Sequence, residues 1–380
     1  MNDYHIYQLV YLLIVSIATF IAIGGYKAKI IPNFAVYYSR KSNWKYSSAL
    51  ILAIAFILLI GLRAEDGQFA DSLNYRTYYY TFYEGVPFHF DRNAENVLFD
   101  NLFAWWGSCK LGVSSFFFLM ASLYFGCMLV ACMRFFPKDT YIGFLCYLAA
   151  FSTFSYSCNG IKAGAAASIF LLAVSYYRNW AVCIPLMLIS WGFHHSMVMP
   201  IAAFVISHFY RNPKHFFYAW AACVLMSALH VSYFQMFFAS LAAESGDSHG
   251  ANYLLSTSAS EWGGKAGFRI DFLIYSAMPV IVGYIAVFKK NLQSNMYNLL
   301  LRLYLTTNAI WLLCMYVEFN NRIAYLSWLL YPIVLIYPFL NLNWSRTQLK
   351  LFSQVTLYHL GFTLFMNLIY YGGLRKLLGI

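Results

Sequence analysis

Twelve apolar stretches, separated by mostly short polar loops, constrain the fold of this 380-residue chain more than any motif does. Hydrophobic residues make up 61% of the sequence and charged residues 10%, which excludes a soluble domain of this length. Since a membrane-crossing helix needs about 20 apolar residues, the sequence predicts an all-α, polytopic integral membrane protein, with residues 1–380 as a single domain. The predicted spans are residues 6–24, 47–62, 113–133, 141–156, 163–177, 181–192, 197–210, 216–238, 271–288, 297–316, 323–340 and 355–371.

Basic residues are concentrated in alternate loops of this pattern. Fourteen of the 25 Lys and Arg residues, but only one of the 14 acids, Asp139, fall on one side of the membrane. Loops rich in Lys and Arg stay in the cytoplasm, so the net charge of +11 indicates topology rather than nucleic-acid binding. The opposite, outer side receives the polar clusters 63–76, 159–162, 194–196 and 318–322. This distribution predicts one external site.

Two predicted outer segments, 63–112 and 239–270, are long enough to hold structure of their own. The first begins as a polar loop and becomes aromatic over 75–83, a run more typical of an interfacial belt than of a sugar-stacking platform. It ends in an amphipathic helix over 93–106, which Asp91 or Asn93 could cap and which we expect in the membrane interface. The second segment is rich in Ser, Ala and Gly and is predicted to be a flexible loop.

Several predicted spans are too short for the bilayer. The spans 181–192 and 197–210 are about 18 and 21 Å long at about 1.5 Å per residue, whereas the hydrocarbon core is about 30 Å thick. Their junction at His194 and His195 is therefore expected below the outer surface, and Lys162 is recessed in the same way. Polar backbone at this depth must line a water-filled cavity or be buried in protein, so we expect an outward-facing cavity lined by basic and histidine side chains.

Five outer cations are candidate ligands for a pyrophosphate group, which Lys and Arg bind well. They are Arg63, Arg76, Lys162, Arg269 and Arg322. The alternative is that a cation only anchors a helix end by extending towards the membrane surface. That alternative is stronger for Arg76 and Arg269 than for the other three.

Asp71 and Glu95 are the best candidate general bases, because a carboxylate near an apolar membrane surface can have its pKa raised towards the working pH. Capping or salt-bridge roles are the alternative for either acid. His194 and His195 are candidates for a base, a phosphate ligand or structural residues, and only one would face the cavity if both were helical. Glu318 is spaced to pair with Arg322. None of the eight cysteines follows the spacing of a zinc site.

These polar clusters resemble, in order along the chain, those of the EpsG family of membrane proteins. The resemblance rests on Gly61, Leu62, Arg63, Gly67, Asp71, Tyr75 and Tyr79; on Phe90, Asp91 and Glu95; on Asn159, Gly160, Ile161, Lys162, Ala165 and Ala166; on Phe193, His194, His195 and Ser196; and on Asn321, Arg322 and Tyr325. It covers residues 60 to 340, and Lys162 stands where the family usually has Arg.

The resemblance implies a polysaccharide polymerase of the Wzy/EpsG kind, an integral glycosyltransferase with GT-C-like architecture in the bacterial inner membrane. Such an enzyme transfers a growing glycan from undecaprenyl pyrophosphate to another lipid-linked repeat unit, making O-antigen, capsule or exopolysaccharide. The donor carries its own leaving group, so no metal or other cofactor is expected. A chain-length regulator protein is an implied partner.

In this interpretation, Arg63, Lys162 and Arg322 hold the departing pyrophosphate. Asp71 or Glu95 accepts the proton of the attacking hydroxyl, with His194 as the third candidate. The remaining candidates would contribute to binding of pyrophosphate or glycan: Arg76, Asn159, His195, Arg269, Asn321 and Tyr325.

Other classes of membrane protein remain as alternatives. A flippase for lipid-linked oligosaccharides would need the cationic cavity but no base, and should show repeats in the two halves of the chain, which we do not find. An O-antigen-ligase-type transferase would share the chemistry and differ in its acceptor, either a lipid A core or a protein. A multi-span acyltransferase is the third alternative.

Overall fold

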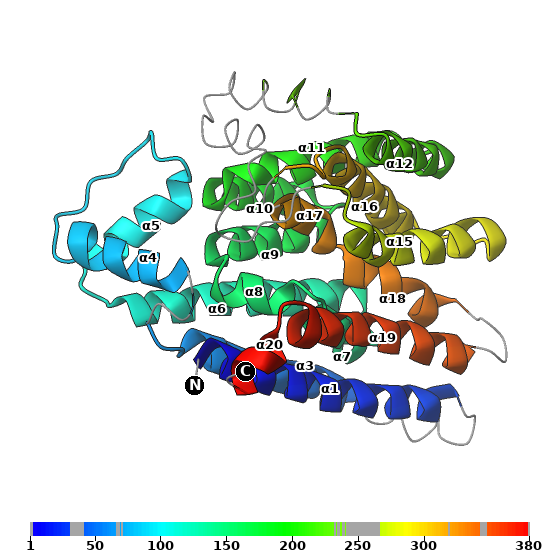
Figure 1. The fold of residues 1–380 in the computed structure, drawn as a ribbon, viewed down its shortest axis with the longest axis horizontal. Coiled ribbons are helices and arrows are strands. Elements are labelled where there is room, and N and C mark those ends of the chain that lie inside the picture. Colours follow the sequence, from blue (N-terminus) through cyan, green and yellow to red (C-terminus); the bar gives the residue numbers. More distant parts are fainter. Residues whose placement is uncertain are drawn as a thin grey trace. The chain divides into compact units, whose positions relative to one another are not determined.

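The computed structural model describes residues 3–30, 42–65, 69, 71–231, 233, 236, 237, 240, 267–317, 320–342 and 348–378 (Figure 1). Every regular element among these residues is helical, as the composition predicts. Most of the predicted outer loop 239–270, together with Gly67 and Glu318, lies outside them. The chain divides into two compact units: unit 1 comprises Met1–Met197 and Phe339–Ile380, and unit 2 comprises Val198–Pro338.

Unit 1 contains the N-terminal helices and the C-terminal helices of the chain. Its elements are α1 (Asp3–Ile30), α3 (Ser42–Gly61), α4 (Asp71–Tyr78), the π-helical turn η2 (Tyr79–Tyr83), α5 (Val97–Ser108), α6 (Val113–Phe135), α7 (Thr140–Leu148), α8 (Thr153–Cys158), α9 (Ile161–Ser175), α10 (Trp180–Phe193), the 3-10 turn η3 (His195–Met197), α19 (Gln348–Leu364), the π-helical turn η6 (Phe365–Tyr370) and α20 (Gly373–Leu378).

The predicted span 141–156 is broken into two helices, α7 and α8. The last carbonyls of a helix have no partner within it, and unpaired backbone groups are costly at membrane depth. Here side chains from α1, α8 and α19 donate to four successive carbonyls. The bonds are His359 Nε2 to Cys146 O (2.8 Å), Thr153 Oγ1 to Tyr147 O (2.7 Å), Tyr11 Oη to Leu148 O (2.6 Å) and Thr363 Oγ1 to Ala149 O (2.7 Å). These side chains explain why a helix can end in the middle of an apolar stretch.

Helix α9 packs closely because its first turns carry small residues. A Cβ atom on Gly164 would lie 2.3 Å from the carbonyl oxygen of Tyr156, so only glycine fits there. Ser190 of α10 donates to the carbonyl of Ala166 at 2.6 Å. This packing holds α10 against α9 and fixes the position of the Ile161 end of α9.

The first outer segment is more helical than predicted. Helix α4 begins at Asp71, within the predicted loop, and η2 forms from the aromatic run. Helix α5 begins at Val97 rather than at residue 93, because the Asp100 carboxylate accepts the Asn96 backbone N–H at 3.0 Å. Asn96 therefore occupies the N-cap position that was predicted for Asp91 or Asn93.

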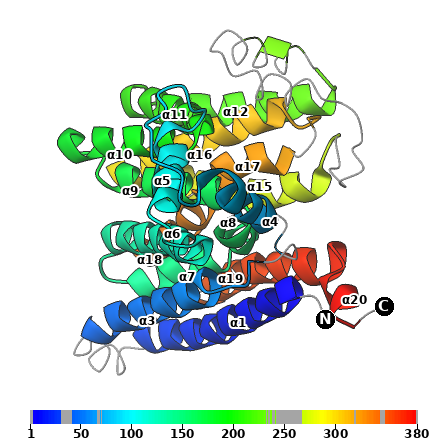
Figure 2. The same cartoon turned by 90° about the vertical axis from the view of Figure 1, so that its left-hand side faces the viewer.

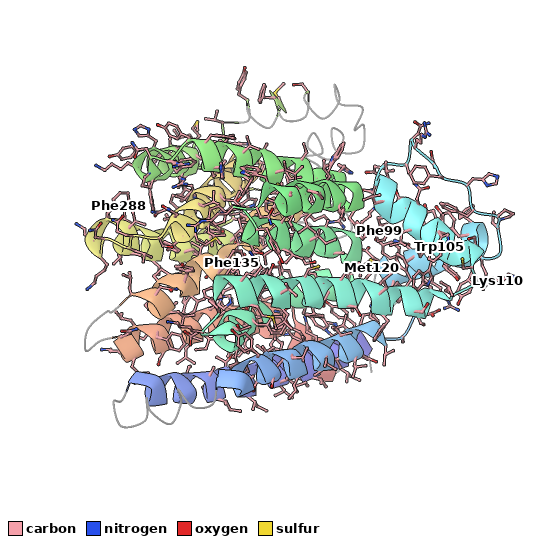
Figure 3. The ribbon with its side chains drawn as sticks, turned by 180° about the vertical axis from the view of Figure 1, so that it is seen from behind. Phe99, Trp105, Lys110, Met120, Phe135 and Phe288 are labelled. Atoms are coloured by element: carbon pink, nitrogen blue, oxygen red, sulfur yellow. The ribbon has the colours of Figure 1, made fainter. Side chains whose placement is uncertain are left out.

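Helices α4 and α5 lie beyond the Val113 end of α6 (Figures 1 and 2). Figure 3 shows Phe99 and Lys110 of this segment on the Met120 side of α6, with Phe135 at the opposite end. Lys162 is in the first turn of α9 and Arg178 follows its last turn, so they lie at opposite ends of one helix. At the Arg178 end of α9, the guanidinium of Arg134 lies 3.5 Å from the centre of the Tyr176 ring.

Unit 2 is built from the remaining helices, which are linked by a chain of buried polar contacts. Its elements are α11 (Val198–Phe209), α12 (Pro213–Ala228), α15 (Ile270–Tyr284), the π-helical turn η4 (Ile285–Lys289), α16 (Asn295–Leu313), α17 (Asn320–Trp328) and most of α18 (Tyr331–Asn341). Trp220 Nε1 donates to Asn308 Oδ1 at 2.7 Å, and Asn308 Nδ2 donates to Ser327 Oγ at 3.0 Å. These bonds join α12, α16 and α17.

Within the part of the chain that the structure describes, four helices are long and apolar enough to cross a membrane, namely Tyr4–Gly25, Val113–Phe135, Ile270–Lys289 and Asn320–Asn341. The apolar helices Ile161–Ser175 and Trp180–Phe193 are shorter, as the sequence predicts. Each of the twelve predicted spans contains helix, although α12 ends at Ala228 within the predicted span 216–238, and the predicted span 323–340 is divided between α17 and α18. The number that cross the bilayer, and a GT-C-like architecture, remain predictions.

Candidate functional site

Polar residues from three separate parts of unit 1 meet where α5 begins. Helix α10 ends at Phe193 and α9 begins at Ile161, so these neighbouring helices present the predicted clusters 194–196 and 159–162 at one end (Figure 2). We call Glu95, Asn96, Asp100, Lys162 and His195 the α5 cluster, because contacts between their atoms join these helices to the start of α5.

Lys162 is the cation of the α5 cluster, and it is only weakly held. Its Nζ lies 3.8 Å from Asp100 Oδ1, and the two side chains are 24% and 30% exposed. Ion pairs that remain partly exposed contribute about 0–1 kcal/mol. The Nζ also lies 5.5 Å from the centre of the Phe99 ring. Lys162 can therefore exchange its carboxylate partner for an anionic ligand at little cost.

Asp100 is a member that the sequence analysis missed. One carboxylate oxygen faces Lys162 and the other accepts the backbone N–H of Asn96, so this residue both starts α5 and places a negative charge beside the cation. The sequence does carry a signal, since an acid in the first turn of a helix is favoured by the helix dipole. The prediction began this helix at residue 93, which placed Asp100 in its middle rather than in its first turn.

His195 is held by the two residues that precede α5. Its backbone N–H donates to Asn96 Oδ1 at 3.0 Å. Its ring Nδ1 lies 3.3 Å from Asn96 Oδ1 and 3.3 Å from Glu95 Oε1. Because both neighbours are acceptors, they favour a proton on Nδ1, which leaves the lone pair of the neutral ring on Nε2. Glu95 and His195 are thus arranged as an oriented acid–imidazole pair.

His194 differs from His195 in its partners. The rings stack with centroids 5.0 Å apart and an interplanar angle of 27°. His194 follows α10 with an extended backbone (φ −154°, ψ 118°), so the helical argument that only one ring faces the site does not apply. Its Nδ1 lies 2.8 Å from Ser196 Oγ and 3.3 Å from the Ser196 backbone N, which donates to it. The proton of a neutral His194 ring is therefore on Nε2.

Arg63 is bound up in structural contacts. It is 2% exposed, and its guanidinium donates to the carbonyls of Ile60 and Cys158 at 2.9 Å and to Ser72 Oγ at 3.3 Å. It also stacks 4.2 Å from the centre of the Phe117 ring. Burial lowers the pKa of Arg63 to about 10, so it stays charged at neutral pH.

The contacts of Arg63 join the ends of three helices near the α5 cluster. Ile60 is in the last turn of α3, Ser72 is in the first turn of α4, and Cys158 ends α8. Asp71, a predicted base, is the first residue of α4, so it lies beside this contact rather than in the α5 cluster. Cys158 precedes Lys162 by four residues, and Arg63 therefore fixes the turn that carries this lysine.

Two further candidates in unit 1 lie close to these residues in the chain. Arg76 is exposed on α4 and is not among the residues that contact one another in the α5 cluster. Asn159 follows α8 and is partly buried, and its Oδ1 is buried with no hydrogen-bond partner among the described residues. This orphaned acceptor lies in the turn between α8 and Lys162.

The candidates of unit 2 gather at the start of α15 and α17. Arg269 forms a two-pronged pair with Asp271, at 2.9 Å for Nε to Oδ1 and 2.6 Å for Nη2 to Oδ2. Its backbone N–H donates to Met315 Sδ at 3.0 Å, and Asn320 Nδ2 donates to the Met315 carbonyl at 2.8 Å. Arg269 is therefore largely neutralised within its own unit. Asn320 belongs to the predicted polar cluster 318–322 but was not predicted as a site residue, and it is buried.

The other unit 2 candidates divide by exposure. Asn321 and Arg322 are exposed in the first turn of α17, whereas Tyr325 is 2% exposed in its interior. Among the described residues of the whole chain, no three His, Cys, Asp or Glu side chains lie close enough together to hold a metal ion.

Comparison with known proteins assigns the chain to a family. The model of the EpsG family matches residues 46–373, a range that contains every candidate site residue. No curated protein and no solved structure matches the chain. Because the family match covers most of the sequence, the chain belongs to the EpsG family.

Proposed function

We propose that this multi-pass membrane protein is a glycosyltransferase that polymerises lipid-linked oligosaccharide repeat units, with the α5 cluster as its reaction centre. Membership of the EpsG family supports the polysaccharide polymerase role. The observation that carries the assignment of the site is the oriented Glu95–His195 pair beside a weakly held Lys162. A transferase with a pyrophosphate leaving group needs a base to accept the proton of the attacking hydroxyl and a cation to stabilise the departing pyrophosphate.

The reaction is a displacement at the anomeric carbon of the donor sugar. The hydroxyl oxygen of the acceptor repeat unit forms a new bond to this carbon, and the bond from the carbon to the pyrophosphate oxygen breaks. The lipid pyrophosphate leaves with the bonding electron pair. In a single displacement the anomeric configuration inverts. Undecaprenyl pyrophosphate is the proposed carrier, and the bacterial inner membrane the proposed location.

His195 acts as the general base in this proposal. The lone pair on Nε2 accepts the proton of the attacking hydroxyl, and Glu95 stabilises the imidazolium that forms. His194 and Asp71, the other candidate bases from the sequence, are less well placed. The lone pair of His194 faces Ser196, and Asp71 lies beside the Arg63 contacts instead.

Lys162 stabilises the leaving group. As negative charge develops on the pyrophosphate, the ammonium moves from Asp100 to the phosphate oxygens, an exchange that is cheap because the existing pair is long and partly exposed. In this proposal Arg63 does not touch the substrate. It positions Lys162 by holding the end of α8, which precedes α9. We retain Arg322, Asn321, Arg76 and Asn159 as proposed contacts to the glycan or its carrier.

A chain-length regulator protein is a proposed partner if the chain is a polymerase. A flippase is the alternative function that would use the same lipid-linked substrate. A flippase forms and breaks no covalent bond in its substrate, so it needs no general base. The pair therefore favours a transferase, whether it acts on another repeat unit or, as a ligase, on a different acceptor.

The test is the length of surface glycan made by cells that lack the gene and carry a variant of it. His195→Ala and Lys162→Ala should each reduce elongation by about 10²–10³-fold, the usual loss when one stabilising or proton-accepting group is removed. Lys162→Arg should retain activity, since arginine keeps the charge and can bind a phosphate through two parallel N–H groups. His89→Ala and Arg92→Ala are matched controls, because both residues are exposed in the loop before α5 and should give glycan of normal length.

Protein levels in the membrane must be equal for the comparison to hold. If His195→Ala and Lys162→Ala both make glycan of normal length at normal protein level, the α5 cluster is not the reaction centre. If they trap single repeat units inside the cell, the protein is a flippase.

A further inference from the structure

One end of unit 2 carries exposed cations that no sequence motif singled out as a site. Arg211 and Lys214 flank the start of α12, and Lys289 and Lys290 lie at the end of η4, which continues α15. All four side chains are exposed. We call these four residues the basic patch.

Aromatic contacts bring the two halves of the basic patch together. The Phe217 ring of α12 lies 5.8 Å from that of Tyr284 and 5.5 Å from that of Phe288, so the start of α12 lies beside the end of α15. Figure 3 labels Phe288 at this end. A fifth cation adds to the charge, since Arg302 Nη1 donates to the carbonyl of Arg211 at 3.3 Å.

The part of unit 2 that the structure describes contains little negative charge, and none of it lies close to the basic patch along the chain. The only acid among those residues is Asp271, which is engaged by Arg269 at the start of α15. It precedes Lys289 by 18 residues along one nearly continuous helix, or about 27 Å at about 1.5 Å per residue. That distance exceeds the Debye length of about 8 Å at physiological ionic strength.

We propose that the basic patch binds the headgroups of anionic phospholipids. It lies at the end of apolar helices, which is where the phosphates of a bilayer are found. Tyr210, Tyr218 and Tyr284 surround it with 46%, 69% and 45% of their surface exposed, and tyrosine is enriched at the membrane–water interface. Each cation near an anionic membrane surface raises affinity by about fivefold. This inference does not depend on the proposed transferase activity.

The test compares two triple variants of the full-length protein, purified in neutral detergent and stripped of lipid. Binding of phosphatidylglycerol and of phosphatidylcholine with the same acyl chains is titrated by native mass spectrometry. The wild type should prefer phosphatidylglycerol. Lys214→Gln/Lys289→Gln/Lys290→Gln should lower the affinity for phosphatidylglycerol by about 100-fold and leave that for phosphatidylcholine unchanged.

The control variant removes the same charge from unit 1. Arg92→Gln/Lys110→Gln/Arg375→Gln changes three exposed cations on the predicted outer side of unit 1, away from the basic patch, and it should lower the phosphatidylglycerol affinity by less than about fivefold. Tm values equal to that of the wild type establish that both variants fold.

Three results would overturn the proposal. One is a wild type without preference for phosphatidylglycerol. Another is an equal loss of affinity in the two triple variants, which would assign the effect to net charge. The third is displacement of phosphatidylglycerol by millimolar inorganic phosphate, which would make the basic patch a site for soluble anions.

Discussion

Arg63 and Lys162 both follow or begin apolar stretches in the sequence, but in the folded chain the first is buried in hydrogen bonds and the second is only weakly paired. Arg63 makes three hydrogen bonds from a buried guanidinium, and hydrogen bonds to charged groups contribute about 1.5–3 kcal/mol each. Lys162 has one long, partly exposed ion pair worth about 0–1 kcal/mol. A substrate anion can therefore recruit Lys162 but would have to dismantle local structure to recruit Arg63.

This contrast predicts opposite responses to conservative substitution at the two positions. Arg63→Lys keeps the charge but loses the fork that reaches Ile60, Ser72 and Cys158, so Tm should fall by several degrees and glycan should be short. Lys162→Arg should keep both Tm and glycan length. Scanning fluorimetry of the purified proteins and glycan analysis check the pair. An Arg63→Lys protein with unchanged Tm would show that the hydrogen bonds of Arg63 are not structural.

At this scale the sequence predicts residue types and places better than partners. Polar residues at the ends of apolar stretches indicated Lys162, Glu95 and the histidine pair as candidates for one outer site. In the structure Lys162 and His195 both contact residues at the start of α5, and their roles stay predictions. Which acid faces which cation depends on helix rotation and on where α5 begins, so Asp100 escaped notice. The tautomers of the two histidines depend on contacts that only the folded chain supplies.

At the scale of elements, Cys109 gives a direct probe of the segment formed by α4 and α5. It follows the last residue of α5 and is the only exposed one among the eight cysteines, all of which the structure describes. A membrane-impermeant maleimide should therefore label the native protein at Cys109 alone. We expect labelling in intact spheroplasts, because this end of unit 1 carries the clusters predicted to face outward.

The control is Cys109→Ser, which should abolish the label without any engineered cysteine. Labelling of the wild type only after the membrane is permeabilised would place the α5 cluster on the cytoplasmic side and contradict an external reaction centre. Labelling that persists in Cys109→Ser would show that a second cysteine is accessible.

The elements themselves were largely predictable, because apolar stretches must form helices in a membrane. The exceptions have local causes. The break between α7 and α8 depends on hydrogen bonds from His359 and Tyr11, which are distant in sequence. Helix α4 forms within a stretch that lacks apolar periodicity, and its start is tied to Arg63 through Ser72.

At the scale of the whole molecule, composition and the order of the clusters predicted the class of protein. Charge segregation and hydropathy are properties of the full chain, so an error in one helix boundary does not change the predicted class. The division into two compact units was not anticipated, since no linker or repeat in the sequence marks residues 197 and 339. The polymerase role rests on the family together with the α5 cluster.

The most direct measurement is polymerisation by the purified protein in liposomes that contain a pyrophosphate-lipid-linked oligosaccharide as the only glycan. We expect a ladder of products that grows by one repeat unit at a time, with one lipid pyrophosphate released for each bond formed. His195→Ala should give no ladder, while His89→Ala should match the wild type. Movement of the lipid across the bilayer by the wild type, without any ladder or release of lipid pyrophosphate, would contradict the account.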